Sequence, residues 1–159
     1  MSHDRPPVRL LPVRFHGAGS VGDFSWMRDQ PDYARALFVF NDNESQFRAH
    51  LDHVAQGAGR CSAGGGNAIA RPWQHDDPPR SAGVPTGDHG GYPSLTPHVR
   101  AVIDEAIARI EALLATGGYD TVVYSADRQG RLGTSIFSPG DDVVDHITGR
   151  LRALAEPPR

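Results

Sequence analysis

One short apolar run most limits what this chain can fold into. Residues Ala36–Phe40 read Ala-Leu-Phe-Val-Phe and are flanked by polar residues. A continuous apolar run of this length is typical of a β-strand that is covered on both faces. Such a sheet needs helices packed against each side. The run therefore predicts an α/β fold.

Helical spacing of apolar residues predicts the helices that supply this cover. The first spans Asn43–Gln56, with Phe47, Leu51 and Val54 forming its apolar stripe. The clearest begins at Thr96 as N-cap with Pro97 in the first helical position, and Gly117-Gly118 ends it. A last helix is expected over Asp141–Ala155, with Asp141 or Asp142 as its cap.

Two further strands are expected, at Val8–Phe15 and Tyr119–Ser125. Pro12 within the first indicates an edge strand or a bulge. The segment Arg71–His98 is rich in proline and glycine, so it is expected to be a long irregular binding loop in which Gly83–Thr86 forms at most a short strand. Strands alternating with helices predict a mainly parallel sheet, with ligands at the carboxyl ends of its strands.

Composition limits the class of protein. The 159 residues suit one domain over residues 8–156, with residues 1–7 and 157–159 as polar tails. We expect a cytoplasmic protein, because the sequence shows neither a membrane span nor a signal peptide and its single cysteine suits a reducing compartment. All 16 basic residues are arginine, which excludes lysine chemistry. Their scatter and the net charge of −3 do not favour nucleic-acid binding.

Two glycine-containing turns are the main functional signal. One is Ser62–Ile69, which contains three consecutive glycines, and the other is Asp127–Ser135, which follows an expected strand. Glycine lets backbone N–H groups approach an anion closely, and a helix that starts after the turn adds the positive end of its dipole. The pair predicts a site that holds a diphosphate from two sides.

The order of these elements resembles the macrodomain superfamily, and in particular compact macro-like proteins of bacteria and phages. The elements that carry the resemblance lie within residues 22–152, and they are Gly22-Asp23-Phe24-Ser25, Phe38-Val39-Phe40-Asn41-Asp42-Asn43, Gly65-Gly66-Asn67-Ala68 and Gly83-Val84-Pro85-Thr86. The resemblance implies a three-layer α/β/α fold with a mixed, mainly parallel sheet. It also implies a cleft for ADP-ribose or an ADP-ribosylated target, with no cofactor and no metal.

The same resemblance implies roles for particular residues. Asp23, with Phe24 beside it, would bind adenine, and Asn41, Asp42 or Asn43 would act at the distal ribose. The first glycine loop would lie against the distal ribose and diphosphate, and it comprises Gly64, Gly65, Gly66 and Asn67. The second phosphate loop comprises Gly130, Leu132, Gly133, Thr134, Ser135, Ile136 and Phe137.

Departures from the family pattern leave three functions open. An extra helix at about residues 44–57 separates the asparagines from the glycines, and Asn67-Ala68 stands where hydrolase members carry an aspartate after the triple glycine. The chain is therefore predicted to hydrolyse an ADP-ribosyl bond, to read ADP-ribose without turnover, or to serve as an interaction domain with an inactive cleft.

Several single residues have two interpretations each. Asp42 is a general base or ribose ligand, or else a helix cap. Asp23 is also explained as a turn residue, and Asn67 as a cap. Three aromatic residues near the predicted cleft could stack on adenine, but we expect each of them to pack in the core; they are Trp73, Tyr92 and Phe137. Loop arginines that could neutralise phosphates are Arg71, Arg128 and Arg131.

Histidines and the cysteine give a weaker signal. His50 and His53 lie three residues apart on one helix face, and candidate partners in the later loop are His75, Asp76, Asp77, Asp88 and His89. No recognised zinc or calcium spacing links them, so we predict no metal site. Cys61 is predicted to be a small core residue rather than an activated thiolate.

Overall fold

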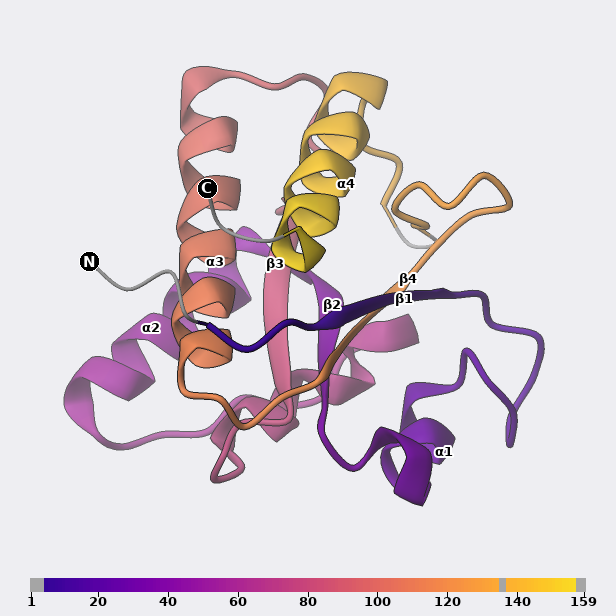
Figure 1. Cartoon of the computed structure of the whole chain (residues 1–159). Helices are drawn as coiled ribbons and strands as arrows, with labels where there is room; N and C mark the ends of the chain where they lie inside the picture. Colours follow the sequence, from indigo (N-terminus) through magenta and orange to yellow (C-terminus); the bar gives the residue numbers. More distant parts are fainter. Residues whose placement is uncertain (1–4, 135–136, 157–159) are drawn as a thin grey trace.

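Four parallel strands form the sheet, in the spatial order β1-β4-β2-β3 (Figure 1). The computed structural model describes residues 5–134 and 137–156. The strands are β1 Arg9–Val13, β2 Ala36–Asn43, β3 Ser81–Gly87 and β4 Thr121–Ser125. The α/β class is confirmed. Every strand pairing in the described sheet is parallel, whereas a mixed sheet was expected.

The helices form largely where apolar spacing predicts them. The α-helices are α1 Phe24–Arg28, α2 Glu44–Gln56, α3 Pro97–Ala115 and α4 Asp141–Ala155, and the 3₁₀ helices are η1 Pro31–Tyr33 and η2 Gly66–His75. Thr96 caps α3 as predicted, since its hydroxyl accepts the Val99 N–H at 3.2 Å. The extra helix predicted between the asparagines and the glycines is α2.

Two local predictions are wrong. The N-cap of α4 is Gly140, and Asp142 instead accepts the N–H groups of Val143 and Leu95. On α2, Val54 is 54% exposed, and His50 is buried one turn before it. In both cases the packing around the helix, rather than the pattern within it, decides which residue caps the helix or is buried.

Both faces of the sheet are covered, as the apolar run in β2 predicts. Alternate residues of that strand belong to two separate clusters: Leu37 and Val39 pack with α3 and α4, while Phe38 and Phe40 pack with α1 and η2. Side chains along a strand point alternately to opposite faces. A strand that is apolar at every position therefore sits at the centre of two cores.

The two prolines of the sheet lie in its edge strands. Pro12 lies in β1, which pairs only with β4, so this edge position agrees with the prediction. Pro85 lies in β3, the opposite edge strand, which pairs with β2. A long irregular loop was expected over 71–98. This is wrong for residues Ser81–Gly87, which form the fully buried strand β3.

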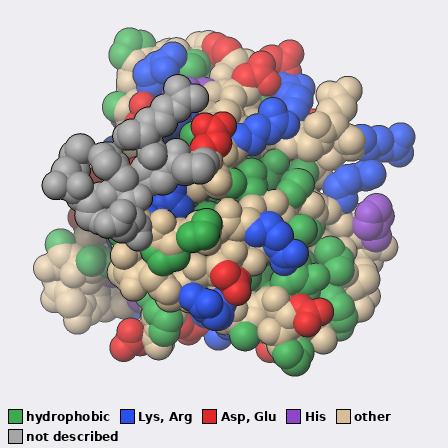
Figure 2. Space-filling model, in the orientation of Figure 1, with side chains coloured by type: hydrophobic (Ala, Val, Ile, Leu, Met, Phe, Trp, Pro, Cys, Tyr) green, Lys and Arg blue, Asp and Glu red, His purple; other side chains and the backbone are tan. Residues whose placement is uncertain are grey.

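No helix among the described residues is long and apolar enough to cross a membrane. On the face drawn in Figure 2, arginine side chains are interspersed with acidic and hydrophobic ones, as their scatter along the sequence predicts.

Candidate ligand-binding cleft

Two adjoining cavities lie where β2 and β4 end. The larger has a volume of about 880 Å³ and the smaller about 210 Å³. They share Asn41, Asn67 and Thr134 as lining residues, so they are parts of one cleft. The carboxyl ends of parallel strands meet at one edge of a sheet, which is where α/β proteins bind ligands. The larger volume is in the range of small-molecule sites.

The predicted site residues gather around this cleft. Those that line the larger cavity are Asp23, Phe24, Gly66, Leu132 and Gly133, those that line the smaller one are Asp42, Asn43, Gly64, Gly65 and Phe137, and the three shared residues are named above. Gly130 lines neither cavity. It lies in a tight turn with φ +80°, where its carbonyl accepts the Tyr124 hydroxyl. Ser135 and Ile136 fall outside the described residues.

An asparagine network ties the ends of the strands together. The Asn41 N–H donates to Asn67 Oδ1 at 3.0 Å, and Asn67 Nδ2 donates to the Ser125 hydroxyl at 2.9 Å. Asn41 Nδ2 donates to the Gly133 carbonyl at 2.8 Å. Asn67 is therefore a bridge between β2 and β4, and Gly65 is the N-cap of η2. Sequence reasoning missed Ser125, since no local pattern marks it.

The first glycine loop leads into η2. Gly66 and Asn67 stand at the start of this helix, where backbone N–H groups have no partner within the helix, and both residues line the cleft. Gly64 is required for a different reason: a Cβ on it would lie 2.8 Å from Arg71 Nη1 and 3.0 Å from the Ala68 Cβ. The loop thus packs tightly on η2, and the Gly64 N–H donates to the Ala68 carbonyl at 3.0 Å.

A buried ion pair lies beneath this loop. Asp42 Oδ1 accepts from Arg71 Nε at 3.1 Å and from Arg71 Nη2 at 2.9 Å, and the two side chains are 0% and 7% exposed. Burial raises the pKa of Asp42, and the charge of Arg71 opposes this. Asp42 Oδ2 has no hydrogen-bond partner among the described residues. The cap of α2 is Asn43, whose side chain accepts the Gln46 N–H at 2.8 Å.

Asp23 is held by its own loop at the other end of the cleft. Its carboxylate accepts the N–H groups of Ser25 at 3.1 Å and of Gly19 at 2.9 Å, so it caps α1. These contacts account for it as a turn residue. Two carboxylate oxygens can accept further hydrogen bonds, so its adenine role stays a prediction.

The other candidates divide between core and cleft. Trp73 meets the Phe38 ring edge-on at 5.6 Å, and the buried Tyr92 donates its hydroxyl to Glu44, so both pack as predicted. Phe137 lines the smaller cavity, and Arg131 lines the larger one while it pairs with Asp141 and Asp145. Arg128 is exposed and lines neither cavity.

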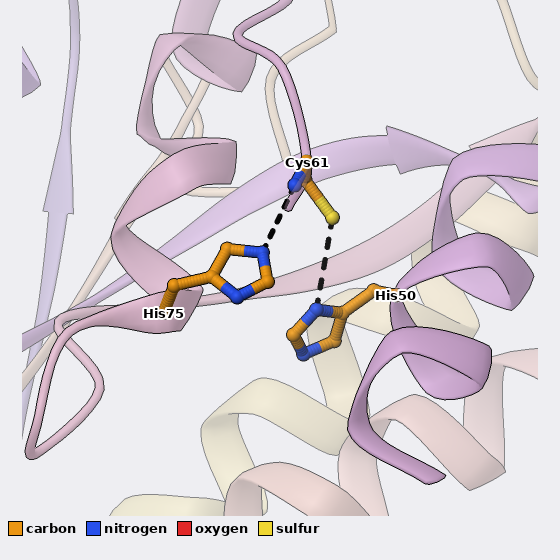
Figure 3. Close-up of side chains that lie close together, drawn as sticks. All are labelled: His50, Cys61 and His75. Carbon is orange, nitrogen blue, oxygen red and sulfur yellow. Dashed lines mark hydrogen bonds between the residues drawn. The ribbon is translucent and has the colours of Figure 1, made fainter. Parts of the chain in front are cut away.

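A second group of polar side chains lies at the C-terminal half of α2, away from the cleft lining. We call it the histidine–cysteine cluster, and its members are His50, His53, Cys61 and His75. Cys61 Sγ lies 3.7 Å from His50 Nδ1, and His75 Nε2 accepts the Cys61 N–H at 2.9 Å (Figure 3). Cys61 Sγ also lies 3.8 Å from His53 Nδ1.

Burial acts on the titratable groups of this cluster. It lowers the pKa of His50 to about 4, assisted by Arg109 and the neighbouring histidines, and it also lowers the pKa of His75. Burial raises the pKa of the Cys61 thiol, and Asp42 adds to this. These shifts favour the neutral imidazoles of His50 and His75 and the protonated thiol of Cys61.

No family model, curated protein or solved structure matches this chain. Membership of the macrodomain superfamily therefore stays a prediction from the residues quoted above.

Proposed function

We propose that the cleft binds ADP-ribose or a related nucleoside diphosphate, on a macrodomain-like arrangement of the sheet and its helices. The observation that carries the proposal is convergence. Segments around Asp23, Asn41, Gly65 and Gly133 are far apart in the sequence, yet all of them line one cleft at the carboxyl ends of the strands.

The chemistry of the lining suits such a ligand. Amides at the start of η2 offer donors for a diphosphate, and Asp23 offers acceptors for an adenine amino group. Arg131 lies at the larger cavity, where it would have to leave Asp141 and Asp145 to reach a phosphate. With no lysine in the chain, backbone N–H groups and arginine are the phosphate-binding groups that it has. The occupant is then the free nucleotide or the ADP-ribosyl group of a modified target.

Hydrolysis of an ADP-ribosyl bond is the catalytic form of this proposal. In it, Asp42 or the neighbouring Asn41 and Asn43 would orient water at the anomeric carbon beside the smaller cavity. A reader without turnover is the second candidate. It is favoured by the Arg71 contact, which neutralises Asp42, and by the capping role of the Asn43 side chain.

Calorimetric titration of the full chain with ADP-ribose tests binding, with ADP, AMP and NAD as comparisons. We expect micromolar affinity, about −8 kcal/mol, with preference for ADP-ribose. Ile69 is 45% exposed and lines the larger cavity, so Ile69→Glu should weaken binding by repelling the diphosphate. Val54→Glu is the matched control, because Val54 is 54% exposed and lines neither cavity.

Absence of binding to all four nucleotides would contradict the proposal, as would equal affinity of the Ile69→Glu variant. If ADP-ribose binds, incubation with an ADP-ribosylated protein separates the two candidates. Release of ADP-ribose identifies a hydrolase, and an intact substrate identifies a reader.

A further inference from the structure

The histidine–cysteine cluster brings together side chains that are widely separated in the sequence. His50 and His53 come from α2, Cys61 from the connection that follows, and His75 from the end of η2. Figure 3 shows His50 and His75 on two sides of Cys61. Three of the eight histidines and the single cysteine of the chain thus meet at one place.

The distances match those around a tetrahedral zinc ion. Zinc bonds of about 2.3 Å to sulfur and about 2.0–2.1 Å to nitrogen place a sulfur and a nitrogen ligand about 3.6 Å apart. The two Sγ···Nδ1 distances from Cys61 are 3.7 and 3.8 Å. Two imidazole rings on one such ion have centres about 5 Å apart. Those of His50 and His75 are 5.3 Å apart, and those of His53 and His75 are 6.2 Å apart, so His53 has further to move.

The hydrogen bond of His75 shows where one lone pair points. A backbone N–H can only donate, so His75 Nε2, which accepts the N–H of Cys61, carries a lone pair directed toward that residue. One ligand atom from each of His50, Cys61 and His75 lies within 4.8 Å of the others. Rotation of these side chains toward one another would bring the three atoms to the separations that a tetrahedral ion requires.

Space for the fourth ring is built into the backbone. Gly59 has φ +96°, and a Cβ at this position would lie 2.4 Å from the His53 ring. The absence of that Cβ lets the ring of His53 lie against the connection that carries Cys61. Burial of Cys61 at 7% exposure argues against the alternative of a histidine-activated nucleophile, because reactive cysteines are partly exposed.

We propose that the histidine–cysteine cluster is a structural Zn²⁺ site. Its ligands are His50, Cys61 and His75, with His53 as the fourth. Thiolate and imidazole together favour zinc over magnesium or calcium, which prefer oxygen. On binding, the Cys61 thiol loses its proton to solvent, and His75 exchanges its hydrogen bond for a bond to the metal.

The site would brace the first glycine loop. In the sequence, Cys61 precedes the first glycine loop and His75 follows it. The Ser62 carbonyl, next to Cys61, accepts a hydrogen bond from Arg71 Nη1 at 3.2 Å. An ion that joins Cys61 to His75 closes the segment that contains this loop. The members of the histidine–cysteine cluster line neither cavity, so zinc binding there does not depend on which ligand the cleft binds.

Metal content of the full chain, prepared without a histidine tag, is the first test. After equilibration with zinc and removal of free metal, inductively coupled plasma mass spectrometry should find about one zinc ion per chain. With Co²⁺ in place of zinc, the absorption spectrum should show a thiolate-to-cobalt charge-transfer band and tetrahedral d–d bands. Less than about 0.1 ion per chain, or a spectrum without the thiolate band, overturns the proposal.

Variants assign the ligands. Cys61→Ser and His75→Ala should each weaken zinc binding at least about tenfold, with circular dichroism confirming that they fold. His89→Ala is the matched control, because the His89 side chain is 99% exposed outside the cluster, and it should bind zinc like the unaltered chain. Undiminished binding by Cys61→Ser overturns the site, and undiminished binding by His53→Ala removes His53 from the ligand set.

A measurement on the unaltered chain avoids any folding defect of the variants. Cys61 is the only cysteine, so its alkylation by iodoacetamide can be followed by the mass of the intact protein. Zinc should slow this reaction, and a chelator should restore it. An alkylation rate that zinc does not change overturns the proposal.

Discussion

Replacing Asp42 with asparagine removes the negative charge that faces Arg71 and keeps the shape of the side chain. The guanidinium then remains buried, and arginine cannot shed its proton. Breaking a buried ion pair in this way costs about 3–5 kcal/mol. Both side chains are at most 7% exposed, so screening by solvent is small. For a chain of this size we expect Tm to fall by roughly 10 °C.

Two comparisons sharpen this prediction. Arg71→Met should cost less than Asp42→Asn, because the stranded Asp42 can take up a proton and burial already raises its pKa. Glu105→Gln breaks an ion pair of similar length, 2.8 Å to Arg48, in which both side chains are 43% exposed. Its cost should stay below about 1 kcal/mol.

Urea denaturation followed by circular dichroism measures all three variants. A loss below about 1 kcal/mol in Asp42→Asn, equal to that of Glu105→Gln, would show that the pair is not buried in solution, and the reasoning would fail. The result also governs how catalysis is tested. Turnover by Asp42→Asn has to be measured well below its Tm, since otherwise unfolding is mistaken for loss of a catalytic base.

Three further predictions concern the loops and their supports. Gly133→Ala should destabilise the fold by about 1–3 kcal/mol, because its Cβ would lie 2.8 Å from the Ala126 carbonyl carbon, whereas Gly149→Ala, in open space on α4, should stabilise it by about 0.5–1 kcal/mol; urea midpoints that move in the same direction would contradict this. Asn67→Ala removes the bridge between β2 and β4, so it should cost about 1 kcal/mol per lost hydrogen bond and weaken ADP-ribose binding by calorimetry; unchanged stability and affinity would refute the bridge. The pKa of Glu44 is lowered from its usual 4.5: burial acts to raise it, but the hydrogen bonds from the Tyr92 hydroxyl and His98 outweigh burial. The contribution of Glu44 to stability is therefore present above pH 4.5 and is lost as pH falls through the lowered pKa of the folded state. Tyr92→Phe should therefore lose less stability than the unaltered chain over that acid range, and thermal melts between pH 3 and 7 with parallel slopes would contradict this.

Local signals account for the parts of the fold that the sequence predicts well. The Thr96-Pro97 start of α3, its apolar spacing and the continuous apolar run of β2 depend on residues within a few positions of one another. The meeting of the second glycine turn with the residues at the end of β2 is also predictable, because parallel strands end at a common edge, whereas the first glycine turn follows α2 and reaches the cleft only through the packing of η2.

Other features depend on partners that are distant in the sequence. The segment Ser81–Gly87 has little β propensity, and it becomes β3 because its small residues permit close packing: a Cβ on Gly83 would lie 2.9 Å from the Phe40 ring. No spacing rule joins Asp42 to Arg71, or His50 to Cys61 and His75. Their chemistry appears only when η2 packs against the sheet.

By itself, the sequence determined the α/β class, the main helices and three of the four described strands, and most of the residues that it marked for the site line the cleft. Those properties follow from periodicity, caps and turn chemistry, which act over one or two turns of chain. Only the tertiary structure decided that Asp42 is held by Arg71, that Asn67 bridges two strands and that the histidines meet Cys61. The physical reason is that burial and pairing between distant residues arise from packing, which no local pattern encodes.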